Sequence, residues 1–376
     1  MSTIAIVGGG IAGLATAISL RRRGIDVTVY ERTPEFAPVG AGILLSPNAF
    51  AVLDFLGLAG EASAAGVELE EFAVTDLALR PYQHLTAEWC REHFRHGLVT
   101  LRRSDLHAVL LSGLGDDAVQ LGKELESLER SPGGVRLTFA DGSSAVADQV
   151  LGADGLRSRV HASLFGKVPL RYAGQSTFRA LVPFELPPPY ARTGTEIWGG
   201  SIRFGFASTK PDEVYYFCVF DAPPGTSYSA TEARRMMLRD LAAFPGVVRE
   251  LVEATPDGAL LQTDIYDFEP IPKWSVGPIG LIGDAAHATT PNLGQGGAQA
   301  LEDAYHLDAC VDAETGRLDL ERFHRIRRSK TAHITNQSFL FGQLAHARRL
   351  TGLRDWILRA TPRWATLRQT ARIYRL

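Results

Sequence analysis

Three glycines near the start of the chain have a spacing that suits the binding of a phosphate group. Gly8, Gly10 and Gly13 form a GxGxxG pattern, and Glu31 follows about 20 residues later. The first glycine allows a tight turn, the second lets a pyrophosphate approach the backbone, and the third lets the next helix lie close to the preceding strand. Amides at that helix N-terminus face the anion, and Glu31 can accept hydrogen bonds from a ribose. The pattern predicts a dinucleotide site without deciding between NAD and FAD.

Two later apolar runs each end in an acidic residue. Asp154 and Gly155 close one run, and Gly283 and Asp284 close the other. A carboxylate at the carboxyl end of a strand can bind the hydroxyl groups of a sugar or of a ribityl chain. The second run leads to a glycine-rich turn at 294–297 that opens a helix, and its N–H groups can face an anionic group.

These groups need a parallel sheet to position them. Ile4–Val7 and Ile25–Tyr30 are apolar runs typical of buried parallel strands, and 14–23 between them reads as a helix. Between 170 and 268 the pattern changes to short alternating runs rich in aromatic and β-branched residues, which indicate a mainly antiparallel sheet. These runs are Ser176–Phe184, Thr195–Trp198, Ile202–Ala207 and Val214–Phe220.

In this order, the three segments resemble the class A flavin-dependent monooxygenases, a family of aromatic hydroxylases and their epoxidase relatives. The most specific part is the string GDAAH, P, GQGG and ALEDA within 283–304. The resemblance implies that the first turn binds the ADP half of FAD, that Asp154 lies near the pyrophosphate, and that Asp284 holds the ribityl chain. It also implies that Pro291 lies against the isoalloxazine ring. The residues it assigns to the cofactor are Gly8, Gly10, Ile11, Ala12, Gly13, Glu31, Arg32, Gly42, Arg103, Leu125, Asp154, Gly283, Asp284, Pro291, Gly294, Gln295, Gly296 and Gly297.

Two of these assignments have a defined partner on the cofactor. Arg103 is expected to hydrogen-bond the flavin chain, although the adjacent Arg102 leaves that register open, and the backbone of Leu125 is expected to pair with adenine. The turn at 294–297 is expected to stabilise negative charge on the flavin during its reduction.

The resemblance also implies an α/β fold with a discontinuous, Rossmann-like FAD-binding domain of the p-hydroxybenzoate hydroxylase type. We expect this domain to be formed by 1–68, 99–169 and 275–340. A mainly antiparallel substrate sheet from 69–98 and 170–274 would be inserted into it, and 341–376 would form a C-terminal helical tail.

The activity implied is NAD(P)H- and O2-dependent hydroxylation of an aromatic or heteroaromatic small molecule through a flavin C4a-hydroperoxide. NADH or NADPH would act as reductant without a domain of its own, since the chain has no second GxGxxG pattern. A polyene epoxidase or an isoprenoid reductase of the same superfamily is the alternative. A nicotinamide dehydrogenase and a non-catalytic FAD-binding protein are rivals from other classes.

Arg203 and Tyr215 are the candidate catalytic residues. They are expected on consecutive strands, and their spacing resembles flavin-dependent urate hydroxylases, in which an arginine and a tyrosine orient a planar anion. Asn292 stands where those enzymes carry an acid, which argues against urate itself. A surface arginine and a core tyrosine without a catalytic role remain the alternative.

The composition argues against other classes of protein. Among 376 residues, 39 Lys and Arg against 42 Asp and Glu give a net charge of −3, without the basic excess of nucleic-acid binding. Three cysteines are too few for a disulfide framework. Cys90, His93 and His96 lack a second ligand pair, so we expect no metal site. Prolines and glycines interrupt the longest uncharged stretch, 36–53, which argues against a membrane span. We expect a cytoplasmic protein.

The C-terminal segment 346–376 is strongly basic, with arginines and a single acid, Asp355. Apolar residues recur there at near-helical spacing. They are Leu350, Leu353, Trp356, Ile357 and Leu358. We expect a terminal helix that packs its apolar face on the body of the protein. A homodimer contact and a contact with a membrane surface stay open.

Overall fold

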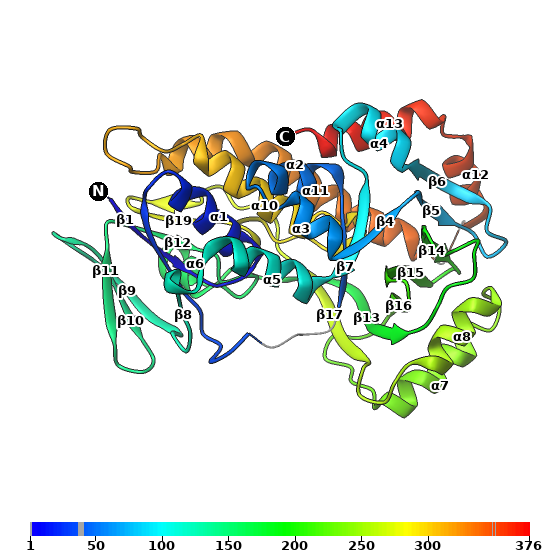
Figure 1. Ribbon diagram of the computed structural model, residues 1–376. Coiled ribbons are helices and arrows are strands. Elements are labelled where there is room, and N and C mark those ends of the chain that lie inside the picture. Colours follow the sequence, from blue (N-terminus) through cyan, green and yellow to red (C-terminus); the bar gives the residue numbers. More distant parts are fainter. Residues whose placement is uncertain (1, 37–40, 348, 350) are drawn as a thin grey trace.

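The computed structural model describes residues 2–36, 41–347, 349 and 351–376. Its first sheet has six strands in the order β18-β19-β12-β1-β2-β8 (Figure 1). All neighbouring strands are parallel except β18 and β19. The strands are β1 (Thr3–Val7), β2 (Asp26–Tyr30), β8 (Val119–Gln120), β12 (Gln149–Gly152), β18 (Ser275–Val276) and β19 (Ile279–Leu281).

This topology brings the three sequence motifs together. β1, β12 and β19 are distant in the chain but adjacent in the sheet. Because they are parallel, the residues that follow each of them meet at the same edge of the sheet. β1 and β2 contact α1 (Ile11–Arg22), which in turn contacts α5 (Arg103–Leu114) and α10 (Gly296–Asp308), and these elements share the largest hydrophobic core among the described residues.

The second sheet has seven strands in the order β17-β13-β16-β15-β14-β5-β6. Only β14 and β5 pair in parallel, so the predicted antiparallel character is observed. The strands are β5 (Glu71–Thr75), β6 (Pro81–Thr86), β13 (Arg171–Pro183), β14 (Thr193–Trp198), β15 (Ile202–Lys210), β16 (Glu213–Asp221) and β17 (Leu261–Asp267).

The two faces of this second sheet have different neighbours. Phe178, Phe204 and Tyr216 lie on the face covered by α7 (Ala230–Asp240) and α8 (Gly246–Ala254), which appear at the lower right of Figure 1. Successive side chains of a strand point to opposite faces. Arg203 and Tyr215 therefore lie on the other face, which is turned toward the nucleotide-binding part.

α11 (Leu320–Ala345) contacts both the part of the protein built around the first sheet and the part built around the second sheet. Its first half packs on α10, and its second half lies on the second sheet, where Phe341 meets Trp198. A small sheet of β3 (Gly42–Leu45), β7 (Leu98–Arg102) and β4 (Gly66–Leu69) also joins the two parts. The boundaries of the two domains stay a prediction.

The remaining elements are short. A peripheral hairpin sheet contains β9 (Leu125–Ser131), β10 (Gly134–Phe139) and β11 (Ser144–Ala147). The other helices are α2 (Pro47–Phe55), α3 (Ala59–Ala64), α4 (Ala87–Phe94), α6 (Arg159–Phe165), α9 (Asp284–His287), α12 (Thr351–Ala360) and α13 (Arg363–Tyr374), with 3-10 turns η1 (Asp116–Ala118) and η2 (Pro291–Leu293).

The C-terminal tail differs from expectation. Leu353, Trp356 and Ile357 on α12 are exposed, whereas Arg354 and the half-buried Leu358 face the body. Leu350 lies outside the described residues. The expectation that the apolar face packs inward is therefore wrong for α12, because the surface that receives this helix is aromatic and acidic and binds its arginines.

Candidate active site

The turn after β1 leaves open space where the pattern predicts a pyrophosphate. A side chain at Gly8, whose φ is 110°, would overlap the carbonyl of Ala153, and one at Gly13 would overlap the carbonyl of Gly8. A Cβ on Gly10 would meet nothing within 4 Å. Gly8 and Gly13 are thus required by close packing within the protein, and Gly10 faces a space that a ligand can enter. This cradle fits the ADP half of FAD.

Glu31 is held in place at the end of β2. Its carboxylate accepts hydrogen bonds from the amides of Gly9 at 2.7 Å and Thr33 at 3.0 Å. The neighbouring Arg32 is exposed. The Glu31 side chain therefore lies beside the glycine turn, where the sequence predicts the adenosine ribose.

Asp284 follows β19 and begins α9 (Asp284–His287). It forms no hydrogen bond with any residue that the structure describes, and its side chain is exposed. Burial nevertheless raises the pKa of Asp284, and His287 and Arg103 oppose that rise. The carboxylate is thus accessible to solvent, although desolvation by nearby protein groups raises its pKa. We call the accessible space in front of it the cofactor hollow. Its two oxygens are free to accept hydrogen bonds there, which fits the ribityl hydroxyls.

The structure distinguishes the two adjacent arginines at the start of α5. Arg102 forms an ion pair with Glu213, with Nε 2.7 Å from Oε1. Arg103 is exposed and makes no ion pair within the described residues, but its charge acts on Asp284. The geometry therefore favours Arg103 as the arginine that is available to a flavin.

The glycine-rich turn at 294–297 begins α10 next to the hollow. Gly294 has a φ of 62°, and both Pro291 and Gly294 are exposed. Gln295 points the other way, where its side chain bonds Ser46 and Asn48 at 3.0 Å each. The Gly294 amide donates to the carbonyl of Pro291 at 2.9 Å, whereas the amides of Gln295, Gly296 and Gly297 form no hydrogen bond within the described residues. These three amides, rather than the Gln295 side chain, are available to a ligand.

A buried polar network supports α10 from behind. Oδ2 of Asp303 accepts hydrogen bonds at 2.7 Å from the Gly283 amide and from Nε2 of His287, and Oδ1 accepts one at 2.8 Å from Arg327. Burial alone would raise the pKa of Asp303, but His287 and Arg327 lower it to about 2. Arg327 also pairs with Glu302. These residues hold the GD segment in position, so His287 has a structural role in this arrangement.

Two predicted cofactor residues have partners inside the chain. The carboxylate of Asp154 accepts a hydrogen bond from Ser158 at 2.5 Å and one from the Arg159 amide at 2.7 Å, which secures the start of α6. The carbonyl of Leu125 accepts a hydrogen bond from Arg159 at 2.8 Å. Direct contacts of these two residues with a cofactor stay predictions.

Arg203 is enclosed rather than open. It is 1% exposed, so the alternative of a surface arginine is wrong. Its Nη1 lies 3.0 Å from Glu196, its Nη2 2.7 Å from Oδ1 of Asn292, and its Nε 2.9 Å from Nε2 of His346. All three guanidinium nitrogens therefore have a partner within the protein.

Tyr215 lies on the same face of the second sheet as Arg203, on the neighbouring strand β16. Arg203 pairs with Val219 and Ala207 pairs with Tyr215, which confirms the expectation of consecutive strands. The ring of Tyr215 lies directly against Gly42, where a side chain would overlap it. Burial raises the pKa of Tyr215, and Arg179 opposes that rise.

Sequence reasoning missed Arg179. It lies on β13 opposite Phe217, its Nε is buried without a hydrogen bond, and it has no ion pair within the described part of the chain. Its Nη2 lies 3.2 Å from Thr263. The alternation Phe178-Arg179-Ala180 was the available signal, because it puts a charge on the face opposite the apolar one.

Contacts between neighbouring residues link the cofactor hollow to this face. A side chain at Gly297 would overlap Ile43, and the preceding Gly42 contacts Tyr215. The start of α10 is thus separated from Tyr215 only by the first residues of β3. A group bound at the turn and a ring bound at Tyr215 would be neighbours.

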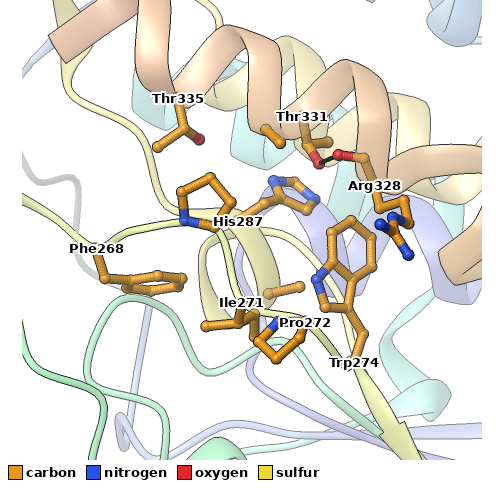
Figure 2. A pocket seen from close by; sticks show the side chains of 11 residues that line it. Phe268, Ile271, Pro272, Trp274, His287, Arg328, Thr331 and Thr335 are labelled. Atoms are coloured by element: carbon orange, nitrogen blue, oxygen red, sulfur yellow. Dashed lines mark hydrogen bonds between the residues drawn. The ribbon is translucent and has the colours of Figure 1, made fainter.

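A separate cavity of about 270 Å³ lies between α11 and the loop from β17 to β18 (Figure 2). Phe268, Trp274 and His287 form part of its wall. Two of its polar side chains have partners in the protein: His287 bonds with Asp303, and Thr335 donates to the carbonyl of Ala288. Within the described residues, no group of three acid, histidine or cysteine side chains could hold a metal ion, and no helix is long and apolar enough to cross a membrane.

Comparisons with known proteins agree with this geometry. Residues 1–199 match the family model of an FAD binding domain. The aurachin C monooxygenase/isomerase of Stigmatella aurantiaca is 34% identical over 344 residues, which are 91% of this chain and 89% of that protein. The 3-amino-4-hydroxybenzoate 2-monooxygenase of Streptomyces cremeus is 36% identical over 88% of this chain and 84% of its own. The crystal structure of Klebsiella pneumoniae HpxO complexed with FAD and uric acid has a TM-score of 0.90 at 27% identity, and covers 99% of this chain and 96% of that one.

Proposed function

Because the chain belongs to the FAD-dependent monooxygenases, we propose that it hydroxylates a small aromatic or heteroaromatic molecule, with O2 as the oxygen donor and NADH or NADPH as the reductant. The observation that carries this proposal is that Gly42 and Ile43 connect Tyr215 to the turn at 294–297. The names of the relatives support it, since one relative is named after a hydroxybenzoate and one similar structure contains uric acid.

FAD, when bound, would supply the electron transfer and the activation of oxygen, which the side chains around the hollow cannot perform. The protein's part is to bind and orient. Gly10 would admit the pyrophosphate in the turn that Gly8 and Gly13 allow, Glu31 would bind the ribose, and Asp284 and Arg103 would bind the ribityl region. The amides at the start of α10 stabilise negative charge on the ring edge that faces them.

The substrate face contributes an orienting pair, Tyr215 and Arg179. The phenol of Tyr215 can donate a hydrogen bond to an oxygen on the substrate ring. Arg179 is a cation without a carboxylate partner in the described chain, and it favours an oxygen that carries negative charge. We therefore propose a substrate ring that bears a hydroxyl, carbonyl or carboxylate oxygen.

Arg203 acts in this proposal as a positioning residue. It connects β14 through Glu196, the turn η2 through Asn292 and the end of α11 through His346. These three elements border the substrate face, so the cluster fixes the shape of the pocket rather than contacting the substrate itself.

Anaerobic reduction of the purified, FAD-loaded protein tests the proposal. NADH or NADPH is mixed with the protein in the presence of phenols, aromatic acids, purines or quinolones, and bleaching of the flavin absorbance is followed. We expect one class of compound to accelerate bleaching many-fold, and a hydroxylated product to form once O2 is admitted. Absence of flavin absorbance, or reduction without any product from this panel, would contradict the proposal.

A polyene epoxidase or isoprenoid reductase remains the second candidate function. The exposed apolar side chains of α12 favour it, because such substrates reside in membranes. Fast reduction of the flavin without an aromatic ligand, together with turnover of a polyene presented in vesicles, would favour this candidate over aromatic hydroxylation.

A further inference from the structure

The C-terminal helices present large apolar side chains to solvent. On α12, Leu353 is 51% exposed, Trp356 65% and Ile357 50%. They stand at i, i+3 and i+4 and so occupy one face of the helix. Trp364 at the start of α13 is 67% exposed. Clustered exposed apolar side chains of this size mark interaction sites.

The outward orientation of α12 is enforced by specific contacts on its opposite face. The guanidinium of Arg354 lies 5.4 Å from the ring centre of Trp198, and that of Arg359 lies 5.0 Å from the ring centre of Tyr82. Arg359 also donates to Asp76 at 2.5 Å. The helix is therefore fixed with its arginines inward and its apolar residues outward, so the exposed face is a feature of the fold.

The neighbouring helix adds positive charge. Arg363, Arg368 and Arg372 on α13 are exposed, and no acidic residue lies between 356 and 376. None of these three arginines forms an ion pair within the described residues. Only Thr361 and Pro362 separate α12 from α13, and both helices lie at the upper right edge of the molecule (Figure 1). We call the exposed residues Leu353, Trp356, Ile357, Trp364, Arg368 and Arg372 the tail face.

We propose that the tail face binds the surface of an anionic lipid bilayer. Tryptophan is suited to the region between lipid headgroups and acyl chains, where its ring is amphipathic. Arginines beside it attract anionic headgroups. An amphipathic segment with this composition lies in the plane of the interface rather than spanning the bilayer.

The charge of the tail face argues against a second copy of the chain as its partner. A symmetric dimer presents the same patch from both subunits. The arginines of α13 would then face one another without an acidic residue on α13 to balance them, since Asp355, the acid of α12, already pairs with Arg354. A surface of anionic lipids provides the opposite charge and an apolar layer at the same time.

Binding of the full-length, FAD-loaded protein to vesicles tests this inference and does not depend on catalysis. The probes are vesicles of phosphatidylcholine alone and of phosphatidylcholine mixed with phosphatidylglycerol, which supplies the negative surface potential that attracts basic segments. The protein is separated from the vesicles by sedimentation at low and at high salt. We expect binding only to the anionic vesicles, with at least tenfold weaker binding at high salt.

Two variants separate the apolar and the charged contributions. Trp356→Ser with Trp364→Ser removes the apolar anchors, and Arg368→Glu with Arg372→Glu reverses the charge; each pair should weaken binding at least tenfold. The matched control is Val146→Ser with Arg136→Glu on the β10–β11 hairpin, which is exposed and far from the tail, and it should bind as the wild type does. Flavin absorbance and the thermal midpoint show that each variant is folded.

Several outcomes would overturn the inference. They are failure to bind anionic vesicles, equal binding to both vesicle types, an equal loss in the hairpin control, or analytical ultracentrifugation showing a dimer that the tail variants abolish. The last result would assign the tail face to self-association. An enzyme that hydroxylates aromatic compounds but ignores vesicles would refute this inference and leave the proposed function intact.

Discussion

Nη2 of Arg203 lies 2.7 Å from Oδ1 of Asn292, and the amide nitrogen of Asn292 donates in turn to the carbonyl of Ser338 at 2.9 Å. The arginine is thereby joined to α11 through a neutral side chain. Its charge is balanced by Glu196, 3.0 Å away, and not by the residue on η2. A buried cation whose counter-ion lies inside the chain supports structure more than it attracts an anionic ligand.

Arg203→Met should therefore destabilise the protein strongly. Removing the cation leaves the side chain of Glu196, which is only 7% exposed, as an unbalanced buried charge. Loss of one partner of a buried ion pair costs about 3–5 kcal/mol. Urea unfolding of the FAD-loaded protein measures this cost. Wild-type stability in this variant would show that the cluster is not structural.

Arg179→Met should have the opposite profile, with little change in stability and a change in ligand preference. The variant removes the cation of the substrate face that has no carboxylate partner within the described residues. It should therefore bind anionic salicylate at least tenfold more weakly than the wild type. Its affinity for neutral salicylamide should stay within about threefold of the wild-type value. Such a factor matches a charge-assisted hydrogen bond of about 1.5–3 kcal/mol. Titrations followed by perturbation of the flavin absorbance give both constants. Equal losses for both ligands would remove Arg179 from anion recognition.

Arg102 and Arg103 form a matched pair of adjacent positions. Arg103→Met should keep the unfolding midpoint of the apoprotein and weaken FAD binding about tenfold or more, because Arg103 lies beside Asp284. Arg102→Met should lower the stability by roughly 1–3 kcal/mol, because it leaves the half-buried pair with Glu213 broken. FAD titration and apoprotein unfolding together separate the two roles. An exchange of the two phenotypes would reverse the assignment.

Gly10 and Gly13 should also respond differently to alanine. Gly10 has a φ of −80°, and its Cβ would point into open space, so Gly10→Ala should fold normally and bind FAD at least tenfold more weakly. A Cβ on Gly13 would overlap the carbonyl of Gly8, so Gly13→Ala should lower the thermal midpoint of the apoprotein as well. Normal FAD content in Gly10→Ala would show that no ligand approaches this backbone.

Acidification should destabilise the protein through His306. Burial, with Arg327 as a further cause, lowers the pKa of His306 to about 4. In the unfolded chain histidine titrates near pH 6.5, so between about pH 6.5 and 4 the unfolded state binds a proton that the folded state does not. Stability is therefore lost as the pH falls through that window, by about 2–3 kcal/mol.

Urea unfolding at several pH values measures this contribution of His306. The loss on acidification should be smaller in His306→Gln, whereas the exposed His93→Gln should lose as much stability as the wild type. Parallel pH profiles for His306→Gln and the wild type would assign the acid sensitivity to other groups.

Short-range patterns in the residue order were enough to predict the nucleotide-binding half of the protein. Gly8, Gly10 and Gly13 are informative because their spacing reports backbone constraints that hold within one short turn. The acids after β12 and β19 follow apolar runs of the length of a buried strand, and parallel strands that share a sheet place such residues at one edge. Local rules were sufficient there, and they also indicated the alternating strands of the second sheet.

Which arginines are open to ligands became evident from the folded chain, and residue order did not indicate it. Arg102 and Arg103, or Arg179 and Arg203, have the same chemistry in the sequence, and their roles differ because of partners more than 80 residues away or on other strands. Arg102 forms an ion pair with Glu213. Arg203 forms hydrogen bonds with Glu196, Asn292 and His346. The orientation of α12 is a further case: its periodicity predicts an apolar face, but the aromatic and acidic surface formed by Trp198, Tyr82 and Asp76 determines that this face points outward. Pairing between distant side chains depends on the assembled sheets, and the order of residues does not carry that information.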